Sequence, residues 1–263
     1  MPDPQPGPFL WRDDVHVWQY FLLAALGVIA GFTNVMAGGG SLLTMPAMIF
    51  LGMPPAMANG TNRVALLAQN VTAVSRFRKK GFSDFKLSLS LALCTLPGAV
   101  IGAFAAVKID PSWFKRLLAL VMIGALIMIL RGGRRKKGTP EKASKARTVW
   151  AHIGMVGVGF YGGFIQAGVG FILMALLNGV LLLDLVRVNM HKVFIVGIYM
   201  VPSLIVFALP GDVAWLAGII LAVGNSAGAW AGTHAAVRGG DKLIRVVFAI
   251  AVIAMAVILV VKA

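Results

Sequence analysis

Long runs of hydrophobic residues, separated by short polar segments, fill the chain from residue 18 to residue 261. A helix of about 20 residues spans the roughly 30 Å hydrocarbon core of a bilayer. Runs near this length cover 18–36, 56–77, 87–107, 113–130, 149–166, 185–209, 213–236 and 243–261. This pattern predicts an all-α polytopic membrane protein.

Glycines interrupt the pattern at Ala37-Gly38-Gly39-Gly40-Ser41 and again at Ala167-Gly168-Val169-Gly170. Each break precedes a short hydrophobic run, 42–52 or 171–183, and a helix of eleven residues reaches only about 16 Å. Glycine destabilises a helix by about 1 kcal/mol, and a break within lipid persists only where protein or a water-filled cavity covers it. Paired breaks of this kind are typical of transporters. The alternative is that these glycines only let helices pack closely.

The two breaks lie 130 positions apart, and the same shift aligns other residues. Asn59 falls on Asn189, while Gly98 and Gly102 fall on Gly228 and Gly232. The register predicts a tandem duplication with an N-terminal tail (1–17), a first transmembrane repeat (18–130), a basic cytoplasmic linker (131–148) and a second transmembrane repeat (149–263).

Lys and Arg gather in some of the segments between hydrophobic runs, which predicts how the repeats are oriented. Loop 76–86 and linker 131–148 are strongly basic, whereas loop 206–216 has no Lys or Arg. Cytoplasmic loops carry an excess of these residues. The distribution favours inverted repeats with both termini extracytoplasmic, and parallel repeats are the alternative. Each half would then hold a glycine-broken re-entrant helix pair and three spanning helices.

Composition excludes several other classes of protein. Of the 263 residues, 59% are hydrophobic and 13% are charged, too few charges for a soluble domain of this length. The net charge of +15 comes mainly from Lys and Arg clustered between the hydrophobic runs, as in cytoplasmic loops, so a nucleic-acid partner is not expected. The single cysteine and four scattered histidines show no metal-ligand spacing. We expect no metal, no cofactor and no catalytic residue.

The candidate substrate site combines the breaks with polar residues inside the following hydrophobic segments. The short helices that begin near Ser41 and Phe171 would direct positive N-terminal ends into the membrane, which suits an anion. Charges within a membrane segment are functional candidates, although they can also snorkel or pair with neighbours. The neighbouring amide and hydroxyl groups could bind the anion or another helix. The predicted substrate-binding residues are Gly38, Gly39, Gly40, Ser41, Asn59, Thr61, Asn62, Arg63, Gly168, Gly170, Asn189, His191 and Lys192.

Other polar residues in the hydrophobic runs are assigned structural roles. Asn34, Gln69, Asn70 and Gln166 are expected to form contacts between helices. Asp184 and Arg187 are expected to pair at a helix boundary.

The motif Gly31-x-x-Asn34-x-x-Ala37-Gly-Gly-Gly40 with Pro46 and Leu51-Gly52, followed by 58–62 (Ala-Asn-Gly-Thr-Asn), resembles the sulfite exporter TauE/SafE family of membrane permeases. The resemblance covers about residues 18–262. It implies a secondary transporter in the cytoplasmic (inner) membrane for a small sulfur oxyanion such as sulfite, sulfoacetate or another organosulfonate. The second half departs from the pattern at Val169 and at 189–192 (Asn-Met-His-Lys).

Other functions stay open alongside this interpretation. A passive anion channel or a non-transporting membrane scaffold would also fit, and an intramembrane enzyme is a weaker alternative because no catalytic pair has usable spacing. The expected partners are a small anionic substrate and the lipid bilayer, and homodimer formation is left open.

Overall fold

The helices that the hydrophobic pattern predicts are present in the computed structural model, which describes residues 17–130 and 144–261. In chain order they are α1 (Val17–Met36), α2 (Ser41–Phe50), α3 (Pro55–Lys79), α4 (Phe85–Lys108), α5 (Pro111–Leu130), α6 (Lys145–Phe164), α7 (Val169–Val180), α8 (Leu185–Ala208) and α9 (Trp215–Val261). The described residues contain no strand. The fold class is therefore all-α, as predicted, while the tail and most of the linker lie outside the described residues.

Two helix boundaries differ from the prediction. Helix α6 begins at Lys145, inside the expected linker, because the Ser144 hydroxyl accepts a hydrogen bond from the Arg147 N–H at 3.4 Å and caps the helix. The gap expected between the runs 213–236 and 243–261 is no more than a kink. Gly240, where φ is 53° and ψ is −157°, is non-helical and separates two helical stretches of α9. Glycine adopts this left-handed conformation without the steric cost that a side chain would bring.

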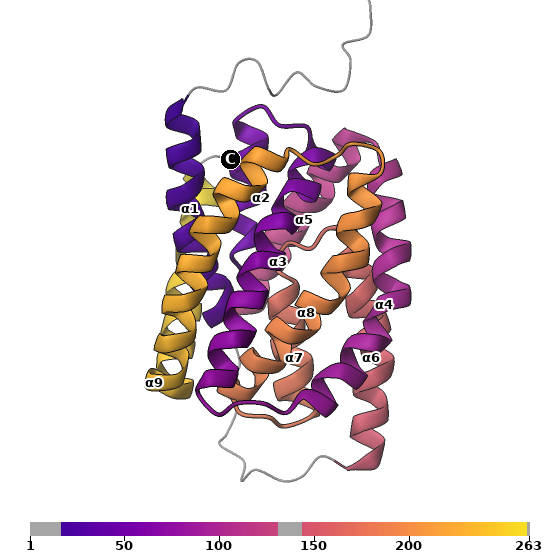
Figure 1. Cartoon of the computed structure of the whole chain (residues 1–263), viewed down its shortest axis with the longest axis vertical. Coiled ribbons are helices and arrows are strands. Elements are labelled where there is room, and N and C mark those ends of the chain that lie inside the picture. The colour runs from indigo at the N-terminus through magenta and orange to yellow at the C-terminus, as the bar shows by residue number, and fades with distance from the viewer. Residues whose placement is uncertain (1–16, 131–143, 262–263) are drawn as a thin grey trace, which may run out of the picture.

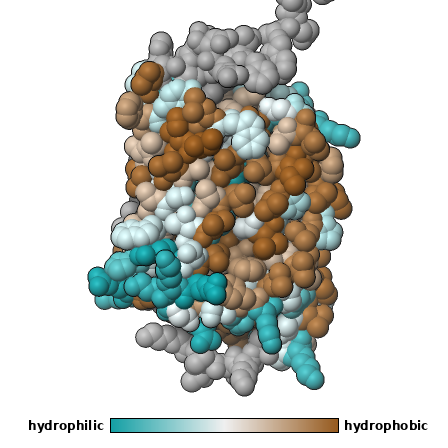
Figure 2. All heavy atoms as spheres, in the orientation of Figure 1, coloured by the Kyte–Doolittle hydropathy of each residue, from teal (hydrophilic) through white to brown (hydrophobic). Residues whose placement is uncertain are grey.

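Four helices among the described residues are long and apolar enough to cross a membrane: α1, α4, α8 and the 215–240 part of α9. Helix α3 is of similar length, but its buried residues include Asn59, Arg63 and Gln69. The face of the bundle seen in Figure 2 is largely hydrophobic, and hydrophilic residues gather towards its ends. Large apolar side chains such as Phe21 and Ile101 are exposed on the surface of the bundle. This surface is suited to lipid.

The two halves pack against each other through matching pairs of helices. Helix α1 packs on α9 and α3 packs on α9, and their repeat counterparts are α6 on α4 and α8 on α4. Helix α1 begins at the upper end of the bundle and α6 at the lower end, while α9 returns towards the upper end (Figure 1). Each half therefore supplies helices that cover the other.

Glycines allow these helix pairs to approach backbone to backbone. A Cβ atom added at Gly31 of α1 would overlap the backbone of Asn225 in α9, and one at Gly163 of α6 would overlap the backbone of Ala99 in α4. Small residues at such crossings are how membrane helices gain close van der Waals contact without a hydrophobic driving force. The close crossings hold α1 and α6 in place, the helices that precede the two glycine breaks and are called their first arms below.

Candidate functional site

The two glycine breaks are in direct contact with each other. Gly38, with φ of 89°, lies between α1 and α2, and Gly168, with φ of 71°, lies directly before α7. A Cβ atom added at Gly38 would lie 2.6 Å from Gly170 Cα, and one added at Gly170 would lie 2.6 Å from Gly38 O. Gly38 and Gly170, which come from different breaks, thus meet with no space for a methyl group between them.

Several backbone N–H groups at the breaks have no hydrogen-bond partner in the described part of the chain. They belong to Gly39, Gly40 and Ser41 at the start of α2, and to Gly168 and Gly170 at the start of α7. All five residues are buried. Buried N–H groups are rarely left unpaired, and helix N-termini carry partial positive charge. The breaks therefore offer an unsatisfied set of donors suited to an anion.

Gln166 connects the two breaks. Its backbone carbonyl accepts a hydrogen bond from the Ser41 hydroxyl at 3.5 Å, and its Oε1 accepts one from the Tyr199 hydroxyl at 2.9 Å. The aromatic ring of Phe171 covers the first break, because a Cβ atom at Gly39 would lie 2.5 Å from Phe171 Cζ. Neither Gln166 nor Tyr199 was among the predicted site residues, although Gln166 stands directly before the second break.

Arg63 of α3 is fully buried and binds the C-terminal end of α6, the helix that precedes the second glycine break. Its NH1 and NH2 groups donate to the carbonyls of Gly162 at 3.2 Å and Gly163 at 2.5 Å, in the last turn of α6. NH2 also donates to Asn59 Oδ1 at 3.2 Å, and Asn59 Nδ2 donates to the Phe164 carbonyl at 2.7 Å. A cation is favourable at a helix C-terminus, where the last carbonyls have no partner within the helix.

Lys192 of α8 binds the C-terminal end of α1 in the same way. Its Nζ donates to the carbonyls of Asn34 at 2.9 Å and Val35 at 3.0 Å, and to Asn189 Oδ1 at 2.7 Å. Asn189 Nδ2 donates to the Met36 carbonyl at 3.3 Å. Asn59 and Arg63 of α3 thus cap the C-terminal end of α6, and Asn189 and Lys192 of α8 cap the C-terminal end of α1. We call this arrangement the reciprocal cap, because each half supplies the cation that binds the end of the other half's first arm.

The reciprocal cap changes how the two cations are interpreted. Of the donor groups of Arg63, only Nε lacks a partner. The ring of Phe207 lies 4.4 Å from its guanidinium carbon, which adds a cation–π contact. Neither Arg63 nor Lys192 has a carboxylate partner beside the breaks in the part of the chain that the structure describes. In the described residues, the ion pair that forms is Arg187–Asp184.

The remaining predicted side chains do not all gather at the breaks. Asn62 does, because its Oδ1 accepts a hydrogen bond from the Thr44 hydroxyl of α2 at 2.7 Å while its Nδ2 stays unpaired and buried. Thr61 instead accepts a hydrogen bond from the Ala214 N–H at 2.9 Å, in the loop before α9. Burial raises the pKa of the Asp212 carboxyl in the same loop.

His191, the repeat counterpart of Thr61, lies against α4. Its Nδ1 is 2.8 Å from the Ser88 hydroxyl, and its Nε2 is buried without a partner in the described residues. Thr61 and His191 thus bind at or just before the first turns of α9 and α4, which are equivalent positions in the two halves. Neither residue contacts a glycine break through a hydrogen bond.

The polar residues assigned to helix contacts behave differently from one another. The Asn34 carbonyl and both oxygens of Gln166 accept hydrogen bonds from other helices. Gln69 is buried, but neither atom of its amide has a partner among the described residues. Asn70 Nδ2 is also unpaired. The Gln69 amide thus makes no interhelical hydrogen bond within the described residues.

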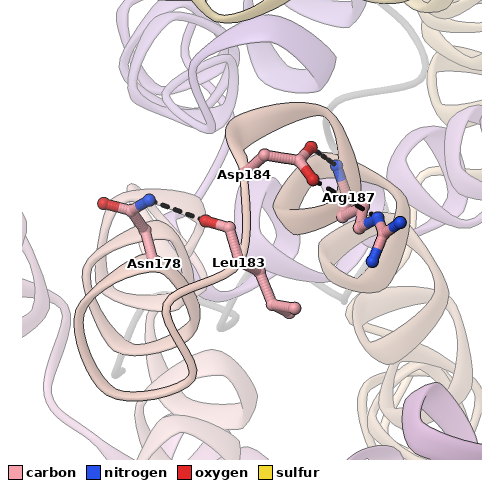
Figure 3. A network of polar contacts seen from close by, with 4 residues as sticks. All are labelled: Asn178, Leu183, Asp184 and Arg187. Carbon is pink, nitrogen blue, oxygen red and sulfur yellow. Dashed lines mark hydrogen bonds and ion pairs between the residues drawn. The ribbon is translucent and has the colours of Figure 1, made fainter. Parts of the chain in front are cut away.

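The boundary pair predicted at the start of α8 is confirmed. Asp184 Oδ2 lies 3.3 Å from Arg187 Nε, and Asp184 Oδ1 accepts a hydrogen bond from the Arg187 N–H at 2.9 Å (Figure 3). Asn178, in the last turn of α7, donates from Nδ2 to the carbonyl of Leu183 in the loop before α8 at 2.7 Å (Figure 3). These bonds fix the entry into the helix that carries Asn189, His191 and Lys192.

The relatives found by comparison with known proteins are named probable membrane transporter proteins. The chain is 29% identical over 243 residues to the probable membrane transporter protein ORF9 of Sinorhizobium sp., covering 92% of each chain. It is 28% identical over 230 residues to the probable membrane transporter protein YfcA of Escherichia coli K12, covering 85% of this chain and 83% of the relative. The match to YunE of Bacillus subtilis, also named a probable membrane transporter protein, is 23% over 238 residues, covering 81% and 85%.

No solved structure matches the chain. The names of its relatives agree with the expectation of a membrane permease that is not an enzyme. Residues 23–259 match the family described as Sulfite exporter TauE/SafE. Together with the all-α membrane fold and its paired glycine breaks, this match places the protein in the TauE/SafE family.

Proposed function

We propose that this protein is a secondary transporter for a small sulfur oxyanion, such as sulfite or an organosulfonate, in the cytoplasmic membrane. One observation carries the proposal: paired helix N-termini present unpaired, buried N–H groups beside two buried cations that lack carboxylate partners. The family and the relatives support membrane transport, and the site chemistry supports an anion.

The site holds positive charge without strong competition from acids. Each helix N-terminus carries about half a unit of positive charge, and Arg63 and Lys192 add to it in their protonated forms. The carbonyls that these side chains cap offset part of that charge. Inside a low-dielectric interior the remaining excess attracts an anion and repels a cation. Sulfite and sulfonate groups present several oxygens that can each accept an N–H hydrogen bond.

The contact between Gly38 and Gly170 excludes an anion from the space directly between them. We therefore place the anion beside this contact, at the N–H groups of Gly39, Gly40 and Ser41, with the Asn62 Nδ2 as an additional donor. In this arrangement Arg63 and Lys192 act through their charge and by fixing the first arms rather than by direct contact.

An inverted arrangement of the halves belongs to the same proposal. Helices α1 and α6 start at opposite ends of the bundle, and the helix pairings exchange between the halves (Figure 1). Such an arrangement lets a transporter expose one central site alternately to each side. The glycine breaks would then be the tips of re-entrant pairs at the centre of the membrane.

Transport of radiolabelled sulfite and methanesulfonate into proteoliposomes tests the proposal. We expect saturable uptake, and counterflow when unlabelled anion is loaded inside. Uptake without saturation or counterflow would indicate a passive channel. Absence of anion flux from correctly folded protein would indicate a scaffold and refute the proposal.

A further inference from the structure

The buried face of α8 towards α4 carries a histidine that the anion site does not use. His191 is fully buried, and its Nδ1 lies 2.8 Å from the Ser88 hydroxyl. The same hydroxyl donates to the Asp84 carbonyl at 2.9 Å. Since a hydroxyl has only one hydrogen, the arrangement that satisfies both bonds has Nδ1–H donating to Ser88 and Ser88 donating to Asp84. The Nε2 atom is then a bare acceptor.

The Nε2 lone pair has no partner in the described residues and is buried. An imidazole in this state can accept one proton without breaking its existing hydrogen bond. His152 on α6 provides a contrast within the same protein, because its Nδ1 lies 2.7 Å from the Thr148 carbonyl and its Nε2 lies 3.1 Å from the Ser90 hydroxyl. Of these two histidines, only His191 has a free ring nitrogen.

His191 lies in the second helical turn of α8, close to the exposed start of that helix. Arg187 lies four residues earlier, so it shares a helix face with His191 and sits about 6 Å closer to the end of the helix. The Arg187 side chain is 63% exposed and that of Asp184 is 48% exposed. The pair shown in Figure 3 therefore marks where water reaches the end of α8, one turn from the histidine.

The charges around His191 are few. Asp84, which precedes α4, acts on the ring, as do Asp184 and Arg187 at the start of α8. The last two form an ion pair and largely offset each other. The buried cations among the described residues are Lys192, which is also on α8 and is directed to the end of α1, and Arg63 of α3, which is directed to the end of α6.

We propose that His191 is the proton-coupling site of the transporter, carrying one proton with each anion. A proton from water adds to the Nε2 lone pair and gives an imidazolium that keeps its Nδ1–H bond to Ser88. On the other side of the membrane the same proton leaves Nε2 as the anion departs, which restores the neutral ring. This inference rests on the proposed anion transport and adds its coupling ion.

Burial explains why proton and anion would travel together. An isolated imidazolium in a buried site is costly, and so is an isolated anion. Each charge reduces the cost of the other, and linkage requires this effect to be reciprocal. The described spanning helices offer no acidic residue as an alternative carrier, since the acids of α8 and α4 lie at or before their first turns. The first half has Thr61 at the equivalent position, so only one half carries this group.

Methanesulfonate is the appropriate probe, because a sulfonate stays ionised throughout the usable pH range. Proteoliposomes are given a pH difference of one unit while potassium and valinomycin hold the membrane potential at zero. One proton per anion predicts about tenfold accumulation of labelled methanesulfonate on the alkaline side. His191→Gln should reduce the ratio to about one, and the matched control His152→Gln should keep it near ten.

The possible results separate the two proposals. Absence of any wild-type flux would refute the transport function itself. Saturable flux with no accumulation under the pH difference would refute proton coupling and leave the transport function standing, as would full accumulation by His191→Gln. If His191→Gln carries no flux at all, Ser88→Ala decides. Removing the Nδ1 partner should shift the pH dependence of uptake in that variant, and an unchanged pH profile would overturn the assignment of His191.

Discussion

Replacement of Gly170 by alanine would place a methyl group in the contact between the two breaks. The new Cβ would lie 2.6 Å from Gly38 O and close to the Gly38 Cα. Since non-bonded atoms prefer about 3.5 Å, the two backbones would have to separate by roughly 1 Å. The obstacle is backbone on both sides, so no side-chain rotation relieves it.

The cost of this separation can be isolated with a matched control. Gly157 of α6 has no atom within 4 Å of its would-be Cβ. Gly157→Ala and Gly170→Ala gain similar helix propensity, about 1 kcal/mol each. The difference in their unfolding free energies therefore reports the overpacking term, which we expect to be about 1–3 kcal/mol.

Binding should respond to the same separation. A shift of roughly 1 Å would misplace the N–H donors of one break relative to the other. Losing one hydrogen bond to a charged group costs about 1.5–3 kcal/mol, which is roughly a tenfold to hundredfold loss of affinity. Unfolding in detergent micelles and calorimetric titration with sulfite measure the two effects. Equal stability and equal affinity in the two variants would refute the contact between the breaks.

Three further predictions test the cations, the first break and the topology. Arg63→Ala leaves three buried oxygens without their donor and should cost about 3 kcal/mol or more of stability, with Arg63→Lys intermediate and the exposed-site control Arg147→Ala near zero in the same unfolding assay. Gly39→Val should abolish sulfite uptake in proteoliposomes while the protein still inserts, and uptake at the wild-type rate would contradict the assigned site. Cysteines placed at Gly211 and at Gly138, which lies outside the described residues, should react with an impermeant thiol reagent from opposite sides of the membrane; labelling from one side would contradict inverted halves.

The sequence was sufficient to predict the helices, because their hydrophobic runs match the length of a bilayer. It also indicated that the breaks at Gly38 and Gly168 are covered by protein or line a cavity, since a helix break within lipid does not persist otherwise. The structure shows that the two breaks touch through Gly38 and Gly170. What periodicity could not supply was the identity of the neighbours at each crossing.

The reciprocal cap illustrates this limit. Sequence placed Arg63 and Lys192 within membrane helices and left two roles open, as anion ligands or as partners of neighbours. Their acceptors are main-chain carbonyls at Gly162, Gly163, Asn34 and Val35, and a carbonyl acceptor leaves no signature in residue type. Equally, nothing in the local sequence distinguishes a paired amide such as Asn59 from the unpaired Gln69.

The reciprocal cap also constrains the order in which the protein can mature. The end of α1 receives its cap from Lys192, and the separation between Lys192 and Asn34 is 158 residues. During synthesis, the first half is therefore inserted with the carbonyls at the end of α1 still lacking these donors, and Arg63 waits for the end of α6, which lies 99 residues later. Neither half is complete as a separate polypeptide, but the two halves made as separate chains carry all the groups needed to finish each other. Each half thus depends on the other to complete the end of the helix before its glycine break.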